Sequence, residues 1–179
     1  TEVLVVMART GADGPGGISA FVVPGDAVGL TYGKNETKMG WNSQPTRAIS
    51  FENVRVPLHC LLGAQGDGFS IAMQGLEGGR INIAACSLGA AQVTLDMTQR
   101  YLSERKQFGQ LLADFQAMQF RLADMATEIE AASLMTHQAG EDKNQGKNVT
   151  QIGAMAKLFA SEVCVKVANN AVQVHGGYG

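Results

Sequence analysis

The chain has 179 residues, of which 45% are hydrophobic, and its formal net charge is −2 at pH 7. This length and apolar content are enough for one ordinary domain or for parts of two, which excludes a disordered chain. Basic residues are interspersed with acidic ones along the sequence, so there is no basic stripe for a phosphate backbone and nucleic acid is not an expected partner.

Residues 1–63 are predicted to form antiparallel β structure. Short apolar runs rich in β-branched residues are separated there by Gly and Pro. The runs at 3–8 and 18–23 flank a segment, residues 11–17, whose composition favours turns, so a hairpin is expected. Two further strand candidates are residues 30–32 and 48–51. Pro57 is expected to close the sheet region because proline cannot join a central ladder.

After residue 63 the apolar residues change to a helical period, and residues 64–179 are predicted to be helical. A first long helix is expected from about Phe69 to Ser103. A second helix is predicted by an apolar stripe at spacings of four and three, with Asp114 as a plausible N-cap. The stripe consists of Met118, Leu122, Met125, Ile129 and Ala132.

A third helix is predicted after the polar stretch of residues 140–148, with Thr150 as a possible cap. Its apolar stripe consists of Ile152, Met155, Phe159, Val163 and Val167. The second and third helices are expected to pack antiparallel as a hairpin. The predicted fold class is therefore α+β, with antiparallel strands followed by an up-down bundle of long helices. The open face of three such helices requires a fourth helix or another subunit.

Generic catalytic motifs are absent: the sequence has no P-loop, no dinucleotide-binding glycine motif, no nucleophile elbow and no paired metal-ligand histidines. Cys60, Cys86 and Cys164 are far apart and without a Cys-x-x-Cys pair. They predict neither a disulfide framework nor a metal site, and they favour a reducing compartment. The apolar runs end well before the roughly 20 residues needed to span a bilayer, so no membrane segment is predicted.

The segment Glu77-Gly78-Gly79-Arg80 lies inside the first predicted helix, where each glycine costs about 1 kcal/mol relative to alanine. Something is therefore expected to approach this backbone closely. One interpretation is tight packing between helices, with an exposed arginine. The other is a helix face that accommodates a bulky ligand, with Glu77 and Arg80 as polar contacts.

Two further segments end predicted helices. The block of residues 105–109, Arg-Lys-Gln-Phe-Gly, has the cations and glycine of an ordinary helix end, but its arginine also suits pyrophosphate and its phenylalanine a flat ring. Residues 173–179 end the third helix, where Gly176 could be an αL cap. The glycines that follow exceed what a cap needs, and their backbone N–H groups can form an anion-binding nest. His175 is not assigned a catalytic role.

In this order, the segments resemble the acyl-CoA dehydrogenase family, over essentially the whole chain. The resemblance is carried by residues 105–109 with Phe115-Gln116, and by residues 173–177. Residues 40–47 and 78–84 further resemble a branch that acts on short branched acyl thioesters such as isobutyryl-CoA. The resemblance implies that residues 1–63 are part of a middle β-domain and residues 64–179 part of a C-terminal α-helical bundle domain.

The resemblance also implies roles for individual residues. The adenosine diphosphate portion of FAD, bound to a neighbouring protomer, would be held by Arg105, Phe115, Gln116, Gln173, Val174, His175, Gly176 and Gly177. The acyl-CoA channel would be lined by Glu77, Gly78, Gly79 and Arg80.

The activity implied by the resemblance is FAD-dependent α,β-dehydrogenation of acyl-CoA thioesters, in fatty-acid catabolism or in branched-chain amino-acid catabolism such as that of valine. In such enzymes a glutamate removes the α-proton and the β-hydride passes to the flavin. The family forms homotetramers and passes electrons to an electron-transfer flavoprotein. The compartment would be the mitochondrial matrix in a eukaryote and the cytoplasm in a bacterium.

The sequence also departs from the family pattern. The usual base is expected downstream of Gly179, so no catalytic residue is assigned. Relatives that act on isovaleryl or long-chain thioesters place the glutamate where this chain has Gly79, and Glu77 lies on a different helix bearing and is not predicted to be the base. Leu111 stands at a position where relatives commonly have proline. The chain starts at Thr1 without a leader, and we expect processing or truncation to have removed its natural start.

We therefore expect the 179-residue chain by itself to have no dehydrogenase turnover. Two alternatives remain open. An acyl-CoA oxidase would use the same fold but return electrons to oxygen. A flavin-free scaffold or binding module derived from the family would bind no flavin.

Overall fold

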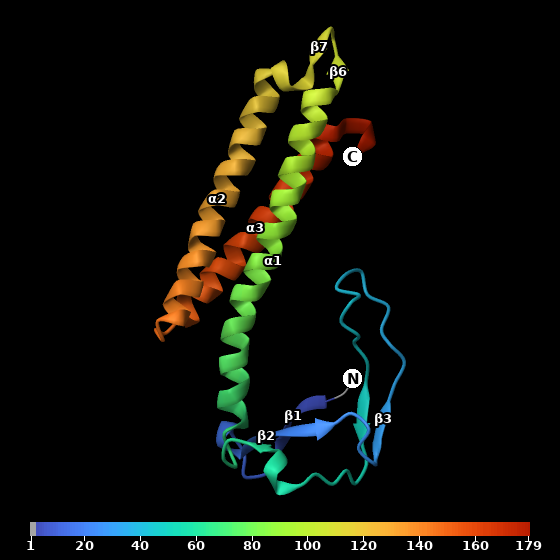
Figure 1. The fold of residues 1–179 in the computed structure, drawn as a ribbon, viewed down its shortest axis with the longest axis vertical. Helices are drawn as coiled ribbons and strands as arrows, with labels where there is room; N and C mark the ends of the chain where they lie inside the picture. Colours follow the sequence, from blue (N-terminus) through green and yellow to red (C-terminus); the bar gives the residue numbers. More distant parts are fainter. Residues whose placement is uncertain (1–2) are drawn as a thin grey trace. The chain divides into compact units, whose positions relative to one another are not determined.

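The computed structural model describes residues 3–179. The chain divides into two compact units, the first ending at Gln74 and the second running from Gly75 to Gly179. The first unit contains the strands and the second contains most of the helical residues (Figure 1).

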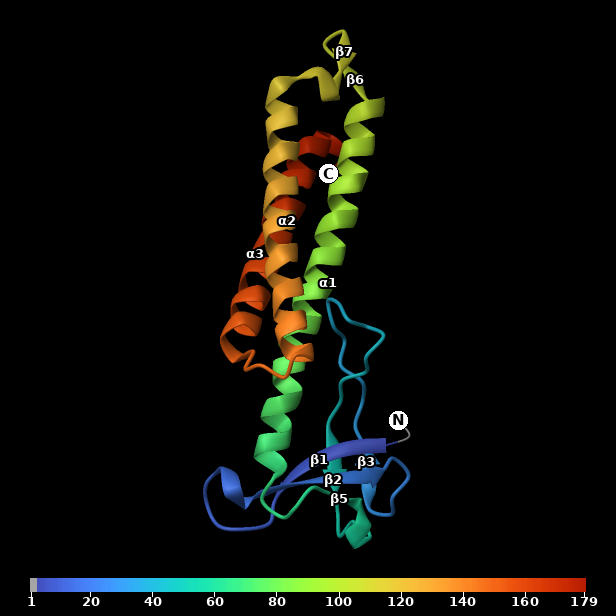
Figure 2. The same ribbon diagram turned by 60° about the vertical axis from the view of Figure 1, so that its left-hand side comes forward.

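The first unit contains the predicted hairpin. Strand β1 (Val3–Arg9) pairs antiparallel with β2 (Ile18–Pro24), with Val6 opposite Phe21. A third strand, β5 (Leu61–Leu62), pairs with the other edge of β2 and completes a sheet of order β1-β2-β5 (Figure 2). The prediction that Pro57 closes the sheet region is therefore wrong. Pro57 lies in a connection before the short 3-10 helix Leu58–Cys60, where its missing N–H breaks no ladder.

The other predicted strand pair is also present. Strand β3 (Leu30–Tyr32) pairs antiparallel with β4 (Ile49–Phe51), with Thr31 opposite Ser50. The second strand starts one residue later than predicted, although the backbone N–H of Gly33 still donates to Ala48 O at 2.9 Å.

The turn between β1 and β2 is closed by backbone and side-chain hydrogen bonds. The Thr10 N–H donates to Gly17 O at 2.8 Å, and the Arg9 guanidinium donates to Ala12 O at 2.7 Å. The buried hydroxyl of Ser19 lies 2.6 Å from the Thr10 hydroxyl. A Cβ at Gly17 would lie 1.9 Å from Ala12 O, so the close backbone approach at this turn requires glycine.

The three predicted long helices are present. Helix α1 (Gly68–Glu104) is followed by α2 (Gln116–Asn144) and α3 (Thr150–His175). Helices α2 and α3 pack antiparallel as a hairpin, as predicted, and in the second unit both run beside α1 (Figures 1 and 2). No helix within residues 3–179 is long and apolar enough to cross a membrane.

The core of the helical unit follows the predicted stripe on α2 more closely than that on α3. Met125, Ile129 and Ala132 are buried on α2 as expected. On α3, Met155 is 45% exposed, which contradicts its predicted place in the stripe. The buried face is formed instead by small residues and valines: Gly153, Ala156, Ala160, Val163, Val167, Ala171 and Val174. A Cβ at Gly153 would lie 3.7 Å from the Ile81 side chain, so a small residue suits this contact.

Both predicted N-caps are wrong. Asp114 lies in a 3-10 turn, Leu112–Asp114, and its carboxylate accepts from the Leu111 N–H at 3.3 Å, whereas the N-cap of α2 is Phe115. Thr150 is the first residue of α3 rather than its cap. The Thr150 N–H donates to the side-chain carbonyl oxygen of Asn148 at 2.9 Å.

A small hairpin joins α1 to α2. Strands β6 (Lys106–Gln107) and β7 (Gln110–Leu111) pair antiparallel, and Phe108 and Gly109 form the turn with φ of 55° and 84°. Positive φ at both central residues is the geometry of a two-residue hairpin turn. Gly109 therefore serves this turn and does not cap α1, which ends at Glu104.

Candidate functional site

The two groups of predicted site residues lie toward opposite ends of the helical unit. Glu77 to Arg80 lie on α1 near the connection between α2 and α3, and Arg105 directly follows the other end of α1. Arg80 and Arg105 are 25 residues apart. At about 1.5 Å per helical residue, this spacing separates them by about 37 Å. The structure therefore brings together the predicted cofactor residues and, separately, the predicted substrate residues.

Arg105 packs against the end of α3. Its guanidinium carbon lies 5.5 Å from the centre of the Tyr178 ring. One helical turn earlier, the Tyr101 ring stacks on His175 with centroids 4.3 Å apart and an interplanar angle of 25°. Within residues 75–179 the Arg105 guanidinium makes no ion pair or side-chain hydrogen bond. This half-buried cation is therefore available to an anion from outside the unit.

The glycine-rich end of α3 turns back on the helix. Gly176 has φ of 59° and ψ of −125°, and its N–H donates to Gln173 O. The φ is positive, as an αL cap requires, but this ψ lies outside the αL region. The chain continues into a short 3-10 turn, Gly176–Tyr178, in which Gly179 N donates to Gly176 O at 3.0 Å. The turn leaves Gln173, Gly176 and Gly177 exposed and Val174 buried.

The start of α2 lies in the same region of the unit. Leu112, just before α2, donates its N–H to Arg105 O at 2.8 Å, so the residues before Phe115 are tied to Arg105. The Phe115 ring contacts Phe108 edge-on, with centroids 6.3 Å apart. Phe108 is 92% exposed, which is unusual for an aromatic ring. Gln116, the first residue of α2, is also exposed.

This end of the unit combines three features that suit a ligand carrying both phosphate and a flat ring. They are a cation without a carboxylate partner in its unit, an exposed aromatic ring at a hairpin turn, and a glycine turn with exposed backbone. A phosphate would meet the guanidinium and backbone N–H groups, and a ring would meet Phe108.

The predicted substrate residues lie at the start of the second unit. Glu77 accepts a hydrogen bond from the Thr150 hydroxyl at 2.5 Å, so its carboxylate tethers the start of α3 to α1. A Cβ at Gly78 would lie 3.6 Å from Lys143 Cε, which is ordinary contact, whereas nothing lies within 4 Å of one at Gly79. Packing between helices thus gives no reason for glycine at position 79. Arg80 is half-buried and forms no ion pair within residues 75–179.

Two ion pairs on the helical surface each shift the pKa of one of their members. The Lys147 ammonium donates a hydrogen bond to Asp142 at 2.8 Å and lowers the pKa of that carboxyl. Glu128 accepts a hydrogen bond from Lys166 and raises the pKa of that ammonium. Neither pair includes a predicted site residue. Within residues 3–179 no cluster of His, Cys, Asp or Glu has the arrangement of a metal site.

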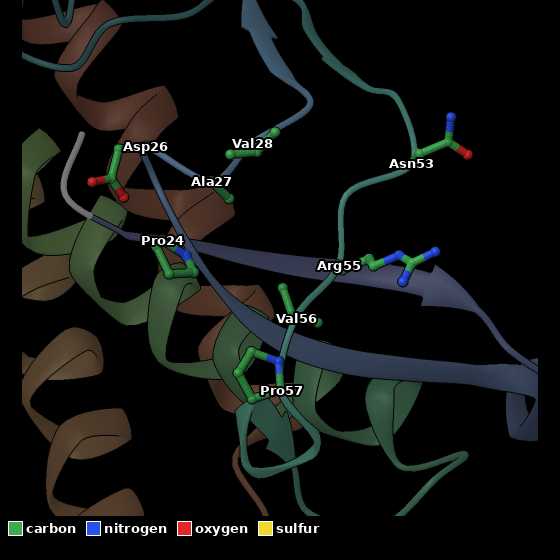
Figure 3. Close-up of a pocket in the computed structure, with 8 residues that line it drawn as sticks. All are labelled: Pro24, Asp26, Ala27, Val28, Asn53, Arg55, Val56 and Pro57. Carbon is green, nitrogen blue, oxygen red and sulfur yellow. The ribbon is translucent and has the colours of Figure 1, made fainter.

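Three pockets of the first unit are lined by none of the predicted site residues. One of about 550 Å³ lies between the β2–β3 connection and the chain after β4 (Figure 3). In the close-up, Arg55 points away from the apolar side chains of Pro24, Val56 and Pro57. This pocket is lined by Pro24, Asp26, Ala27, Val28, Asn53, Arg55, Val56 and Pro57. Its lining therefore combines an apolar wall with two charged residues, Asp26 and Arg55.

Sequence reasoning missed Tyr101 as a neighbour of the candidate site. Its ring meets His175, 74 residues away in the sequence, and no local pattern announces that contact. The available signal was its spacing of four residues from Arg105, which places both residues on one face of a helix. Tyr178, whose ring lies near Arg105, has no sequence signal beyond its place in the terminal segment.

Comparison with known protein families identifies this architecture. Residues 66–179 match the family described as acyl-CoA dehydrogenase, C-terminal domain. The chain therefore belongs to the acyl-CoA dehydrogenase family, as the sequence predicted. The general activity of this family is FAD-dependent dehydrogenation.

Individual relatives extend the similarity to the whole chain. The chain is 51% identical to the mitochondrial isobutyryl-CoA dehydrogenase of Dictyostelium discoideum, covering 100% of this chain and 44% of that protein. It is 47% identical to the caffeyl-CoA reductase-Etf complex subunit CarC of Acetobacterium woodii, covering 98% of this chain and 46% of that protein. The structure of butyryl-CoA dehydrogenase from Megasphaera elsdenii superimposes with a TM-score of 0.94 at 43% identity, covering 99% of this chain and 46% of that one. The chain thus spans less than half the length of these relatives.

The residues at the Arg105 end fit the cofactor of the family. FAD carries a pyrophosphate and two flat ring systems, which are the two chemistries that the Arg105 cation, the glycine turn and Phe108 suit. The fit concerns only the part of a flavin site that these residues could form.

Proposed function

We propose that this chain forms the C-terminal part of an FAD-dependent dehydrogenase that acts on short branched acyl-CoA thioesters resembling isobutyryl-CoA. The main support is one observation: Arg105 and the glycine turn after α3 lie together at one end of the helical unit. The similarity to the isobutyryl-CoA dehydrogenase of Dictyostelium discoideum supports the acyl group.

In this proposal, the diphosphate part of FAD from a neighbouring protomer is held at the Arg105 end. Arg105 supplies charge, and Gly177 supplies a backbone N–H donor beside Gly176, whose own N–H is bonded to Gln173 O. The remaining residues of this group are Phe115, Gln116, Gln173, Val174 and His175. FAD, when bound, supplies the hydride acceptor of the reaction. None of these side chains is assigned the proton abstraction, and we place the base glutamate downstream of Gly179.

The proposed substrate contacts lie at Glu77, Gly78, Gly79 and Arg80. The open space beside Gly79 supports a ligand there, because the glycine serves no packing contact in the unit. The Thr150 hydroxyl occupies one Glu77 oxygen, which supports a positioning role for this carboxylate rather than that of a base.

The assembly and partners follow from the same proposal. Two protomers are needed if the Arg105 end serves the FAD of a neighbour, in agreement with a homotetramer. An electron-transfer flavoprotein is the proposed electron acceptor, and the relative from Acetobacterium woodii is a subunit of a caffeyl-CoA reductase-Etf complex. The compartment would be the mitochondrial matrix in a eukaryote or the cytoplasm in a bacterium.

The substrate is tested with the full-length protein purified as the holoenzyme. We expect turnover with isobutyryl-CoA that exceeds turnover with linear butyryl-CoA in kcat/KM, with electron-transfer flavoprotein as acceptor. Electron transfer to oxygen at a comparable rate would identify an oxidase. A colourless protein that takes up no flavin would contradict the proposed function altogether.

The cofactor site is tested by Arg105→Ala in the same protein. Loss of a charge-assisted contact to phosphate is worth about 1.5–3 kcal/mol, so FAD should bind roughly tenfold to a hundredfold more weakly. Arg100→Ala is the matched control, because Arg100 is an exposed arginine in the last turns of α1, shortly before Arg105. Equal flavin content in both variants would remove Arg105 from the site.

A further inference from the structure

The end of α3 is held beside Arg105 by a side chain that has no direct place in the proposed cofactor site. We propose that Tyr101 is a positioning residue that fixes His175 and the following glycine turn, and so sets the phosphate-binding geometry. This inference rests on the proposed FAD role of that end of the unit. It assigns Tyr101 no contact with the cofactor.

Tyr101 holds His175 in two ways. Its ring stacks on the imidazole at 4.3 Å and 25°, which is near-parallel stacking. Its hydroxyl also donates to the backbone oxygen of His175 at 3.4 Å. Because His175 is the last residue of α3, both contacts act at the point where the helix ends and the glycine turn starts.

His175 is fixed from a second direction as well. Its Nδ1 lies 2.9 Å from Ala171 O. A carbonyl oxygen can only accept, so Nδ1 carries the proton and the ring is anchored to the last turn of α3. With one ring face against Tyr101 and Nδ1 engaged, only Nε2 remains for an outside partner. The imidazole therefore has a defined orientation before any ligand arrives.

The end of α1 and the residue that follows it contact both sides of the glycine turn. The Arg105 N–H donates to Tyr101 O at 2.9 Å, so the two residues follow each other by one helical turn. Tyr101 contacts His175 before the glycines, and Arg105 contacts Tyr178 after them. Gly176 and Gly177 are thus held between one contact from the last turn of α1 and one from the residue after it.

Such a support matters because glycine is the most flexible residue. Gly176 adopts a positive φ, and two further glycines follow within three residues. A segment of this composition loses much conformational entropy when it closes around an anion. If Tyr101 already restricts the turn, part of that loss occurs on folding, and binding becomes stronger.

The test uses the full-length protein freed of FAD and measures the Kd for FAD by quenching of flavin fluorescence. Tyr101→Leu removes the ring and the hydroxyl, and we expect Kd to rise about tenfold, as the loss of one aromatic pair would give. Tyr101→Phe keeps the stacked ring, so it should remain within about threefold of the wild type. ADP is the portion of FAD proposed to bind here. Its Kd should also rise more in Tyr101→Leu than in Tyr101→Phe.

Leu95→Ala is the control for general destabilisation. Leu95 is a core residue of α1 that lies six residues before Tyr101, more than one helical turn away. The control should lower the unfolding temperature at least as much as Tyr101→Leu and leave the Kd for FAD unchanged. A spectroscopic readout completes the test: the proton NMR signals of the His175 ring should shift in Tyr101→Leu, where the neighbouring ring is gone, and stay near their positions in Leu95→Ala.

The outcomes separate the two proposals. A wild-type protein that binds no FAD would overturn the proposed function, whatever Tyr101 does. A wild-type protein that binds FAD with the same Kd as Tyr101→Leu would overturn the positioning role alone, as would an equal loss of affinity in Leu95→Ala. If Tyr101→Leu does not fold, Tyr101→Gln replaces it, because glutamine is a good helix former without a ring.

Discussion

At the scale of single residues, glycines at different positions serve different purposes. Gly176 has a φ of 59°, which side-chain-bearing residues rarely adopt. Gly79 and Gly89 lie in α1 with negative φ, and nothing is within 4 Å of a Cβ placed on either. The first glycine is required by the backbone of this unit, and the other two are not.

Gly176→Ala should therefore destabilise the helical unit by about 1 kcal/mol, because alanine disfavours positive φ. Gly89→Ala should stabilise it by about 0.5–1 kcal/mol, because alanine is the better helix former. Urea unfolding followed by circular dichroism measures both changes. Equal effects of the two substitutions would mean that the glycine turn is not formed in solution.

Gly79→Ala separates a packing role from a ligand role. The added methyl group meets open space in the unit, so we expect stability to rise by about 0.5–1 kcal/mol, as in Gly89→Ala. If the acyl-CoA lies along this face, KM for isobutyryl-CoA should nevertheless rise several-fold in Gly79→Ala alone. Steady-state kinetics of the full-length protein decide this, and an unchanged KM would argue against a substrate at position 79.

At the scale of elements, the position of α3 depends on small residues. Gly153, Ala156 and Ala160 form its buried face near the start of the helix, while Met155 is turned to the surface. A pattern that gives weight to large apolar residues therefore selects the wrong member at position 155. Close approach of two helices favours the smaller side chains, and this is a property of the packed pair rather than of the local sequence.

A matched pair of methionines tests this arrangement. Met125 on α2 is 1% exposed and Met155 on α3 is 45% exposed. Met125→Ala should cost about 2–5 kcal/mol because it leaves a cavity in the core. Met155→Ala should change the free energy of unfolding by less than about 1 kcal/mol. Similar losses in both variants, measured by chemical unfolding, would place Met155 in the core after all.

The end of α2 gives a prediction on pH. The hydrogen bond from Lys147 lowers the pKa of Asp142, with a smaller contribution from Gln138. A lowered folded-state pKa stabilises the fold above the unfolded pKa, and this contribution is lost as pH falls through the folded value. Carboxyl carbon NMR should thus show Asp142 titrating at higher pH in Lys147→Met than in the wild type, and only slightly higher in Gln138→Ala. Identical titrations in Lys147→Met and the wild type would exclude the ion pair in solution.

The sequence predicted more of the elements than of their ends. The β1–β2 hairpin and the three long helices follow from local composition and period, and all are present. The caps at Asp114 and Thr150 were predicted incorrectly, because each side chain found another hydrogen-bond partner in three dimensions. The short strand β5 was not expected, since two residues carry no periodic signal.

The candidate site shows the same limit. Arg105 and the glycine turn could be identified from residue types and a family resemblance. The contact of Tyr101 with His175 joins residues that are 74 positions apart, and it depends on the packing of α1 against α3. Pattern within a short window does not contain that information.

At the scale of the whole molecule, the chain carries two groups of residues proposed for different ligands but no assigned base. We therefore expect the 179-residue chain, purified alone, to show no reduction of a dye acceptor with isobutyryl-CoA. The full-length protein under the same conditions is the positive control. Measurable turnover by the chain alone would mean that a residue within it performs the proton abstraction.

The continuity of α1 has a consequence for its length. Arg80 and Arg105 belong to one uninterrupted run of helix and its first following residue, separated by 25 residues. This separation is close to seven whole turns at about 3.6 residues per turn, so both residues have nearly the same angular phase. An insertion of one residue between them would rotate one relative to the other by about 100°, whereas seven residues would restore the phase within about 20°. Length changes in this helix should therefore be tolerated only in multiples that preserve the phase.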